Sequence, residues 1–214
     1  MKKYKLELFL ESDTLVGSAE GYGSTIDTDI VFDEVGLPFI PSKRIKGILR
    51  NSAEDLRDMF NEAKIDILIS TDDIFGWVGE TNATKMFLSN LYPAEYELTK
   101  SNLKNSQVRM SKEDVLEYFT SIRRQTSVEK ETRKVKEHSL RTSRVLKGGG
   151  SFSGEIEFDE KNENIMGLVC QNARRMGTKR NRGLGKISIK LTGDNDLPLN
   201  DRSIKFIEEA KCIF

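Results

Sequence analysis

The 214-residue sequence predicts an α+β protein with a ferredoxin-like βαββαβ core and one inserted segment. Two patterns indicate this fold. Several short segments alternate apolar and polar residues, as strands with one buried face do, and two longer segments repeat apolar residues at spacings of three and four, as amphipathic helices do. Their order is strand, helix, strand, strand, helix, strand, which gives an antiparallel sheet with both helices on one face.

The first strand and the first helix have clear patterns. Apolar and charged side chains alternate over residues 4–10, which predicts a strand. A polar, glycine-rich loop over residues 17–33 follows. Ser42 comes directly after Pro41 and is the expected cap of a helix over about residues 43–63. The apolar positions that define this helix are Ile45, Ile48, Leu49, Leu56, Met59, Phe60 and Ala63.

The other three strands are less regular. A second strand is expected over residues 86–91, ended by Tyr92 and Pro93. A third is predicted over residues 152–158, where apolar and polar residues again alternate. The last strand is expected where Ile187, Ile189 and Leu191 follow the same period of two.

Two further segments complete the chain. Residues from about 94 to 150 show weak periodicity, apart from a short helical stretch near residues 112–122, and end in three glycines. We expect them to be an insertion within a single domain over residues 1–214. After the third strand, Asp159 is the expected cap of a second helix. The apolar side of that helix would consist of Ile165, Leu168, Val169, Ala173 and Met176.

The charges are balanced in number but clustered along the chain. Lysines and arginines total 34, aspartates and glutamates also 34, and the formal net charge is zero. Residues 123–147 nevertheless contain nine basic residues and three glutamates, and residues 174–190 contain seven basic residues and no acid. Acidic residues gather around residues 54–73. We therefore expect faces of opposite sign, one of which can hold a polyanion, although such runs are often ordinary solvated surface.

The cysteines and the first residues bear on location. Only Cys170 and Cys212 are present, without the paired spacing of a zinc site or a disulfide framework. The beginning of the sequence shows no long apolar run, so we expect neither a signal peptide nor a membrane span. The expected location is a reducing cytoplasm, with no membrane partner.

A glycine-rich basic loop, residues 176–186, lies between the second helix and the last strand. Glycine permits positive φ and a close approach of ligand to backbone, and exposed amides and cations suit a chain of phosphates. A surface turn without function can have the same composition. The nucleic-acid-binding residues expected in this loop are Gly177, Lys179, Arg180, Arg182, Gly183, Gly185 and Lys186.

The start of the first helix carries four cations within its first turns. Cations do not suit a helix N-terminus, which is already the positive end of the dipole, and a bound anion would remove this conflict. An ordinary basic helix side with a packing glycine is the alternative. The binding residues expected here are Ser42, Lys43, Arg44, Lys46, Gly47 and Arg50.

Together these motifs resemble those of the RAMP superfamily of CRISPR-associated proteins, in their order and in their separation. The resemblance implies an RRM-like RNA-binding fold and, more specifically, a guide-RNA-binding backbone subunit of a type III CRISPR effector complex. It extends from the first strand to the last. It rests on the run from Gly36 to Pro41, the Lys46-Gly47 pair with Arg50, residues 74–76, the segment from Arg141 to Phe158, and the Arg182-Gly183-Leu184-Gly185 loop.

Backbone subunits of this kind polymerise along a guide RNA and insert a thumb hairpin between paired segments. The resemblance places the thumb in residues 123–147 and implies RNA contacts by Arg141 and Arg144. The partners it implies are guide RNA, complementary target RNA and other CRISPR effector subunits, including copies or paralogues of the chain itself.

Such subunits also cut the paired target RNA with an aspartate in the loop between the first strand and the first helix. Asp27 best matches that position, with Asp29 and Asp33 as rivals. The implied cofactor is Mg²⁺ or another divalent cation held by Asp27. A carboxylate beside a scissile phosphate can position a hard cation that polarises the phosphoryl oxygens and helps activate the 2′-hydroxyl.

Two other functions remain open. A purely structural guide-binding subunit would keep the basic motifs without a working carboxylate. A guide-processing endoribonuclease of the same superfamily would act without metal through a histidine, and His138 in the expected thumb is the single histidine. We expect His138 to be a bystander or an RNA contact. Phe75 and Trp77 can stack on a base, but core packing is the better expectation for both.

Overall fold

The computed structural model describes residues 1–17, 26–76, 85–105, 110–129, 131–193 and 198–211. The strands are β1 (Lys2–Leu10), β2 (Phe87–Leu88), β3 (Tyr92–Pro93), β4 (Thr120–Gln125), β5 (Arg141–Leu146), β6 (Ser151–Phe158) and β7 (Ile187–Thr192). The helices are α1 (Ser42–Glu62), α2 (Thr71–Phe75), α3 (Tyr96–Asn105), α4 (Lys112–Phe119), α5 (Glu163–Asn172) and α6 (Leu199–Lys211). Two 3₁₀ turns are η1 (Glu160–Asn162) and η2 (Arg180–Arg182).

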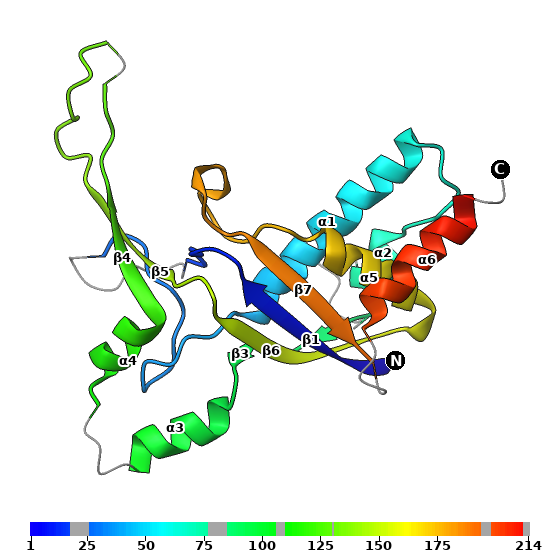
Figure 1. Cartoon of the computed structure of the whole chain (residues 1–214), viewed down its shortest axis with the longest axis horizontal. Coiled ribbons are helices and arrows are strands. Elements are labelled where there is room, and N and C mark those ends of the chain that lie inside the picture. Colours follow the sequence, from blue (N-terminus) through cyan, green and yellow to red (C-terminus); the bar gives the residue numbers. More distant parts are fainter. Residues whose placement is uncertain (18–25, 77–84, 106–109, 130, 194–197, 212–214) are drawn as a thin grey trace.

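The main sheet is antiparallel, with strand order β2-β6-β1-β7, and β3 also pairs with β6 (Figure 1). This order, with β2 and β3 together as the second core strand, confirms the predicted ferredoxin-like βαββαβ core. Strand β1 lies in the middle, with Leu6 opposite Gly154 of β6 and Leu191 of β7. Leu6 and Leu8 are completely buried in one core with Ile45 and Leu49 of α1 and with α5. The alternation in the sequence therefore sets the buried face of the sheet.

The N-terminus of α1 is capped differently from the prediction. Ser42 is the first helical residue, Pro41 occupies the N-cap position, and no side chain of either residue caps the helix. The Ser42 backbone N–H instead donates to the Asn90 side-chain oxygen at 2.9 Å. Asn90 is held there because its neighbour Leu91 exchanges two backbone hydrogen bonds of 2.9 Å with Ile40. The prediction of Ser42 as the cap is therefore wrong.

The second core strand is shorter than expected and is interrupted. Only Phe87 and Leu88 of the expected stretch form β2, and Tyr92 and Pro93, expected to end it, pair with β6 as β3. Between the two, the chain passes over Gly154 of β6, where a Cβ would lie only 2.6 Å from Leu91 Cδ2. Glycine at this position lets the crossing segment lie against the sheet.

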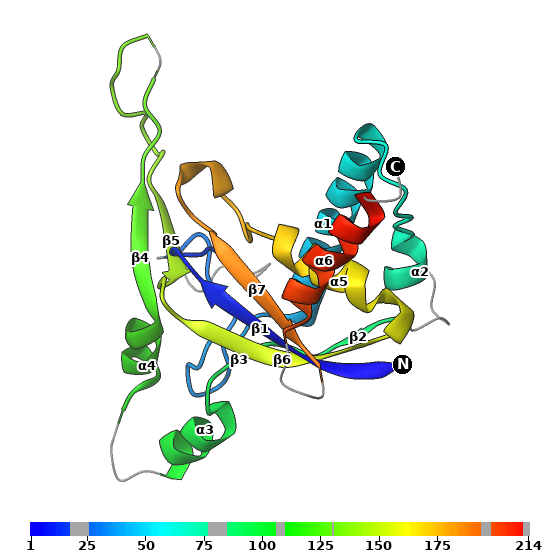
Figure 2. The same ribbon diagram turned by 45° about the vertical axis from the view of Figure 1, so that its right-hand side comes forward.

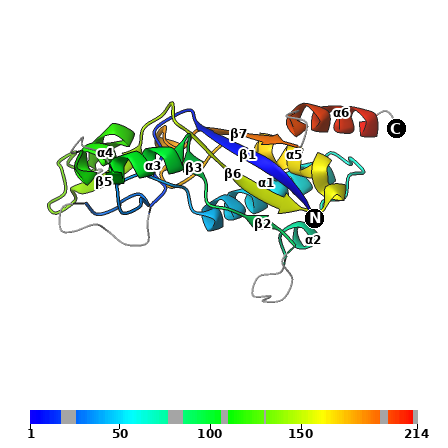
Figure 3. The same ribbon diagram turned by 90° about the horizontal axis from the view of Figure 1, so that it is seen from below.

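The inserted segment contains more regular structure than its sequence indicated. Helix α3 was not predicted, and the expected helix near residues 112–122 ends at Phe119, so that Ile122 belongs to β4. Strand β4 pairs with β5 along its whole length. We call residues 120–146 the hairpin arm, because the chain between the two strands extends far from the main sheet (Figures 1 and 2). The arm lies with α3 and α4 at one end of the molecule, and α6 lies at the other (Figure 3).

The second core helix begins with the turn η1. Asp159 caps this turn, accepting from the Lys161 N–H at 3.2 Å, rather than α5 itself. Ala173 and Met176, expected on the apolar side of the helix, follow its end but are buried. Helix α6 was not predicted and packs so closely on α5 that a Cβ on Gly167 would overlap with Ser203.

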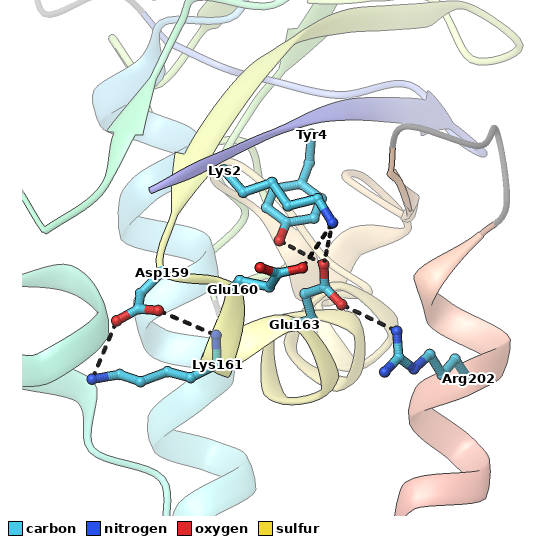
Figure 4. A network of polar contacts seen from close by, with 7 residues as sticks. All are labelled: Lys2, Tyr4, Asp159, Glu160, Lys161, Glu163 and Arg202. Atoms are coloured by element: carbon cyan, nitrogen blue, oxygen red, sulfur yellow. Dashed lines mark hydrogen bonds and ion pairs between the residues drawn. The ribbon is translucent and has the colours of Figure 1, made fainter.

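A buried carboxylate joins β1, α5 and α6 (Figure 4). Glu163 accepts hydrogen bonds from the Tyr4 hydroxyl at 2.7 Å, from Lys2 Nζ at 3.2 Å and from Arg202 Nη1 at 3.1 Å. Burial by itself would raise the pKa of Glu163, but the hydrogen bonds from Tyr4 and Lys2 outweigh it and hold the pKa below its usual range. The carboxylate therefore stays ionised at neutral pH.

Replacing Tyr4 by phenylalanine is expected to lower the free energy of unfolding by about 1–3 kcal/mol at neutral pH, because a buried ionised group loses a hydrogen bond. The stabilisation from Glu163 is present above the ordinary carboxyl pKa of about 4.3 and is lost as the pH falls through the lower folded-state pKa. The cost of Tyr4→Phe should therefore shrink in acid. Urea unfolding from neutral pH to about pH 3 measures this cost.

The control is Tyr118→Phe, because Tyr118 is 73% exposed and its hydroxyl contacts no carboxylate within the described ranges. A cost of Tyr4→Phe that does not change with pH would show that Glu163 is not the group through which Tyr4 stabilises the fold.

Candidate nucleic-acid interface

The two basic motifs, far apart in the sequence, line one groove. The groove has a volume of about 430 Å³ and lies between the first half of α1 and the loop that follows α5. Three predicted binding residues of α1 line it, Lys43, Arg44 and Gly47, as do Gly177 and Arg180 of the loop. The remaining lining residues are Leu15, Val16, Gly17, Thr28, Ile48, Asn51, Arg175, Met176 and Thr178.

The glycine-rich loop is held by the segment of chain that follows β1. The Thr178 N–H donates to the Leu15 carbonyl at 3.2 Å, and the Gly185 N–H donates to the Asp13 carbonyl at 2.9 Å. These bonds fix both ends of the loop, so its exposed cations project from a defined backbone.

The three predicted glycines of this loop differ in their surroundings. Gly177 and Gly185 have φ values of 81° and 76°, and a Cβ on either would overlap with a backbone oxygen of Leu15 or Met176. Glycine is therefore required at these two positions by the packing of the loop. Gly183 has φ of 77° with open space around its Cβ position. A ligand can approach the backbone at Gly183.

The cations of α1 divide into two groups. Arg44 lies at the groove and donates to the Gly17 carbonyl at 3.1 Å, and the Cβ position of Gly47 faces open space. Lys46 and Arg50 do not line the groove. Arg50 donates to the Gly76 carbonyl and lies 3.7 Å from the Asp72 carboxylate, beside α2. Burial, with a contribution from Arg50, lowers the pKa of Lys46.

The cations of the loop divide in the same way. Lys179 donates to the Gln125 side chain of the hairpin arm at 2.8 Å, and Lys186 pairs with Glu11 at 2.6 Å. Arg180 and Arg182 are exposed, and their guanidinium groups have no ion pair within the described ranges. These two arginines are the cations of the loop that are available to an anion.

Asp27 lies at the base of the hairpin arm. Its Oδ2 accepts from the Thr142 N–H at 2.7 Å, and its Oδ1 lies 3.4 Å from Arg141 Nη1. The Thr142 N–H, followed by Arg141, holds the pKa of Asp27 below its usual range. The Asp27 N–H also donates to the Thr142 carbonyl at 2.9 Å. An exposed, ionised carboxylate is thus attached to the first residues of β5.

Asp29 is the most deeply buried of the three loop aspartates. Its Oδ1 accepts from the Ile30 N–H at 2.7 Å, and its Oδ2 lies 3.4 Å from Arg144 Nη1. Asp29 Oδ2 and Arg144 Nη1 are both buried, and neither atom has a hydrogen-bond partner among the described residues. The two charges face each other where Thr28 pairs with Ser143 as a parallel bridge. The sequence predicted Arg144 as an RNA contact, and the structure places it against this carboxylate.

Asp33 is tied to the local backbone and to α3. Its Oδ1 accepts from the Val35 N–H at 3.0 Å and from the Leu37 N–H at 2.9 Å. Its Oδ2 accepts from the Tyr96 hydroxyl at 3.0 Å and lies 3.4 Å from Lys100 Nζ. Asp33 therefore shapes the turn before α1.

Asp13, which was not among the predicted residues, connects the hairpin arm to the core. Its carboxylate accepts from Arg123 Nη2 at 2.8 Å and from the Gly148 N–H at 3.0 Å. Burial opposes ionisation, but these two hydrogen bonds outweigh it and lower the pKa of Asp13. No local motif marks this residue, and only its position directly after a central strand could have drawn attention to it.

Of the three candidate aspartates, Asp27 alone has an exposed carboxylate that a divalent cation can reach. No group of three or more cysteine, histidine, aspartate or glutamate side chains that could hold a metal occurs in the described ranges. A single carboxylate fits the coordination of Mg²⁺, which often binds one or two carboxylates of a protein and takes its other ligands from water and substrate phosphates. It does not form a protein cage for a cation.

The open face of the main sheet carries alternating charges. Lys3 lies 3.8 Å from Glu155 and 3.3 Å from Glu157, and Lys5 lies 2.7 Å from Glu7. A face in which cations are matched by carboxylates attracts phosphates weakly. The groove beside α1, rather than this face, concentrates unpaired cations.

Three candidates of the sequence remain, His138, Phe75 and Trp77, and the two in the described ranges do not line the groove. His138 is exposed in the hairpin arm, with φ of 55°. Phe75 is buried, at 3% exposure, as expected for a core residue. Trp77 lies outside the described residues.

Comparisons with known proteins agree with the fold. Two chains in cryo-EM structures of the type III-B Cmr-beta complex are similar, one from the complex bound to cognate target RNA and one from its apo state. The first has a TM-score of 0.64 at 10% identity and covers 89% of this chain and 97% of that chain. The second has a TM-score of 0.61 at 12% identity and covers 90% and 98%. No curated protein matches the sequence at a significant level.

No helix in the described ranges is long and apolar enough to cross a membrane.

The family model of the RAMP superfamily matches residues 9–188, from the end of β1 to the beginning of β7. This range contains α1, the hairpin arm and the glycine-rich loop. The chain therefore belongs to the RAMP superfamily.

Proposed function

We propose that the chain is a guide-RNA-binding backbone subunit of a type III CRISPR effector complex, acting in the cytoplasm. The observation that carries the proposal is the single groove in which the start of α1 meets the glycine-rich loop. Similar chains occur in Cmr-beta structures, one of them bound to target RNA, which supports other effector subunits and RNA as partners.

The groove suits a phosphate chain for two reasons. Lys43 and Arg180 are exposed on its two walls and have no ion pair within the described ranges, so phosphates between them need not displace a carboxylate. Gly47 in the groove leaves open space beside the backbone, where a sugar-phosphate strand can pass closely, and Gly183 does the same in the loop that continues from the groove. Both features act on the sugar-phosphate backbone, so the groove itself does not discriminate between bases.

The hairpin arm is proposed to be the thumb that lies between paired segments of guide and target. Arg133, Lys134 and Lys136 are exposed along it, and Asp27 is attached at its base through Thr142. We propose that Asp27 enables cleavage of target RNA opposite the arm with a divalent cation, whose remaining ligands come from phosphate and water. Arg141 would turn from Asp27 to an RNA phosphate when RNA is bound.

Two alternatives give different experimental results. A purely structural subunit would bind guide and target without cutting. A guide-processing nuclease acting through His138 would cut without metal, so a chelator would not stop it. His138 is exposed in the arm, and no carboxylate among the described residues is hydrogen-bonded to it. This position favours the metal-dependent mechanism.

Removing an unpaired cation of the groove should weaken RNA binding without sequence preference. Lys43→Ala and Arg180→Ala are each expected to lower the affinity for single-stranded RNA and to reduce the slope of log K against log salt by about 0.7, the value for one lost phosphate contact. Fluorescence anisotropy over a range of salt concentrations measures both quantities.

The matched control for these variants is Arg57→Ala, because Arg57 is a cation in the second half of the same helix and pairs with Asp58 at 3.0 Å. Lys46→Ala should have a smaller effect than Lys43→Ala, because Lys46 lies outside the groove. Equal effects of Arg57→Ala and Arg180→Ala would show that binding depends on total charge rather than on this site.

The hairpin arm should be sensitive to trypsin in the free chain and protected when guide and target RNA are bound. Its basic residues are exposed, and the chain between β4 and β5 extends away from the main sheet (Figure 1). Mass spectrometry of the fragments measures cleavage after Arg133, Lys134 and Lys136. Cleavage after Lys205 of α6 is the internal control, and similar rates in the arm with and without RNA would argue against an RNA-bound thumb.

The third prediction of this function is that Asp27→Asn abolishes metal-dependent cutting and leaves assembly and target binding intact. Asparagine keeps an oxygen that can accept from the Thr142 N–H but loses the charge that attracts a cation. The assay pairs the assembled complex with a complementary RNA, with magnesium and with a chelator.

Asp29→Asn and Asp33→Asn are the comparison variants, and both should act mainly on stability. Asp29→Asn leaves the buried Arg144 without its counter-charge, and Asp33→Asn weakens the turn before α1. A thermal melt beside each cleavage assay separates the two effects. Full cutting by Asp27→Asn would move the catalytic role to a neighbour, and full cutting by all three would exclude this loop from the reaction.

A further inference from the structure

A second hollow continues the groove along α1. Its volume is about 330 Å³, and it shares four lining residues with the groove: Ile48, Asn51, Arg175 and Arg180. Beyond these it is lined by Ser52, Asp55, Asn172, Ala173 and Arg174. None of these nine residues except Arg180 was a predicted binding residue.

The α1 side chains that line the groove differ in charge from those that line the hollow. The groove has Lys43 and Arg44 on its α1 wall, whereas the hollow has Asn51 and Asp55, one turn apart on the same helix face. Asp55 is exposed, and its carboxylate has no hydrogen bond or ion pair within the described ranges. The hollow thus combines one free carboxylate with three arginines, Arg174, Arg175 and Arg180, so it is suited to a group that both donates and accepts hydrogen bonds.

The remaining lining residues hold the hollow in shape. The Asn172 side chain donates to the Ser52 carbonyl at 3.3 Å, which connects the end of α5 to α1. Arg175 Nη1 donates to the Arg180 carbonyl at 2.7 Å, so one guanidinium group is fixed where groove and hollow meet. Ile48 and Ala173 add apolar surface. Apolar surface, a guanidinium plane and edge-on polar groups are what an unstacked base contacts in a protein.

We propose that this hollow binds an unpaired guanine of the RNA whose phosphates lie in the groove. The proposal rests on the RNA-binding function proposed above and adds a base preference to it. Guanine offers two neighbouring donors, N1–H and the N2 amino group, which a carboxylate can accept together. It also offers the acceptors O6 and N7, which suit an arginine. Adenine and cytosine each pair a donor with an acceptor on that edge, and uracil has one donor between two acceptors.

The donors and acceptors of guanine assign a role to each polar residue of the hollow. Asp55 accepts from N1–H and N2, Arg174 or Arg175 on the facing wall donates to O6 and N7, and Asn51 is close enough to the groove to reach the ribose or phosphate. The phosphates of the same nucleotide remain with Arg180, which lines both spaces. Base and backbone are thus bound by different parts of one continuous surface.

The test compares short single-stranded RNAs that contain only uridine with the same RNAs carrying one central guanosine, inosine or adenosine. A uridine RNA can slide along the groove, so a single guanosine can reach the hollow whatever its position. The wild-type chain is expected to bind the guanosine RNA about tenfold more tightly than the uridine RNA, the value of one bidentate base contact. Inosine, which lacks the N2 amino group, should have a smaller advantage, and adenosine none.

Two variants with the same change of charge decide the assignment. Asp55→Asn should reduce the ratio of the guanosine affinity to the uridine affinity to about one, whereas Asp58→Asn, on an exposed side chain outside both spaces, should leave the ratio unchanged. Because both variants lose one negative charge, comparing them removes any general gain in RNA affinity.

Each remaining outcome contradicts a distinct claim. Equal binding of uridine and guanosine RNAs by the wild-type chain would overturn the guanine site and leave the groove in place. A guanosine preference that persists in Asp55→Asn would move the base to another surface. No binding of any RNA, in the chain or in its assembled complex, would overturn the proposed function and this inference together.

Discussion

The stretch of chain that continues β1 beyond the main sheet, residues 11–17, is the constraint on which both candidate functional regions depend. On one side its carbonyl oxygens accept hydrogen bonds from the 176–186 loop. On the other side Thr14 and Leu146 exchange two backbone hydrogen bonds of 2.9 Å at the end of the hairpin arm. Because β1 is a central strand with a fully buried face, the core fixes the position of residues 11–17, which directly follow it. The groove and the arm are therefore placed relative to each other by a single segment.

One ionised carboxylate strengthens this junction. Asp13 binds Arg123 of the arm and the Gly148 N–H through its side chain while its carbonyl holds the glycine-rich loop. Loss of that charge would leave two donors unsatisfied at the point where the arm leaves the core, which costs more than the loss of an exposed ion pair. The arm carries Thr142, and Thr142 holds Asp27, so the position of the proposed catalytic carboxylate depends on the same junction.

The fold can be predicted from the sequence where burial of one face sets the period of the apolar residues. It is harder to predict where a helix or strand forms because of contacts with residues distant in the sequence. The alternation in residues 4–10 and 152–158 is imposed by a sheet with one buried face, and both strands are present. Helix α6 was not predicted, although Phe206, Ile207 and Ala210 follow a helical spacing and pack against the core. The pairing of β4 with β5 carries no such signal, since each strand is stabilised by a partner that is distant in the sequence. Ser42 is an instructive error, because a residue type that often caps helices was available but Asn90, from another segment, occupies that place. The resemblance implied that both basic motifs contact RNA, but it was the structure that brought them together in one groove. Asp55 and Asn172 became candidates only once α1 and the end of α5 were seen to line one hollow.

The net charge of zero does not decide whether the chain binds a polyanion, because the cations differ in what they face. Those that meet a carboxylate are already neutralised locally, and a phosphate can recruit them only by displacing that partner, which costs part of the gain. Those without a partner offer their full charge. Within the described ranges the second kind occurs in the groove, in the hollow and loop beside it and along the arm, where we propose that RNA binds, and singly elsewhere, as at Lys64 and Lys205. The cations with an ion pair include Arg50, Arg123, Arg141, Arg144 and Lys186, and those without one include Lys43, Arg174, Arg180, Arg182, Arg133, Lys134 and Lys136. An overall balance of charge combined with local imbalance weakens the attraction of a polyanion to most of the surface and favours the places where unpaired cations gather.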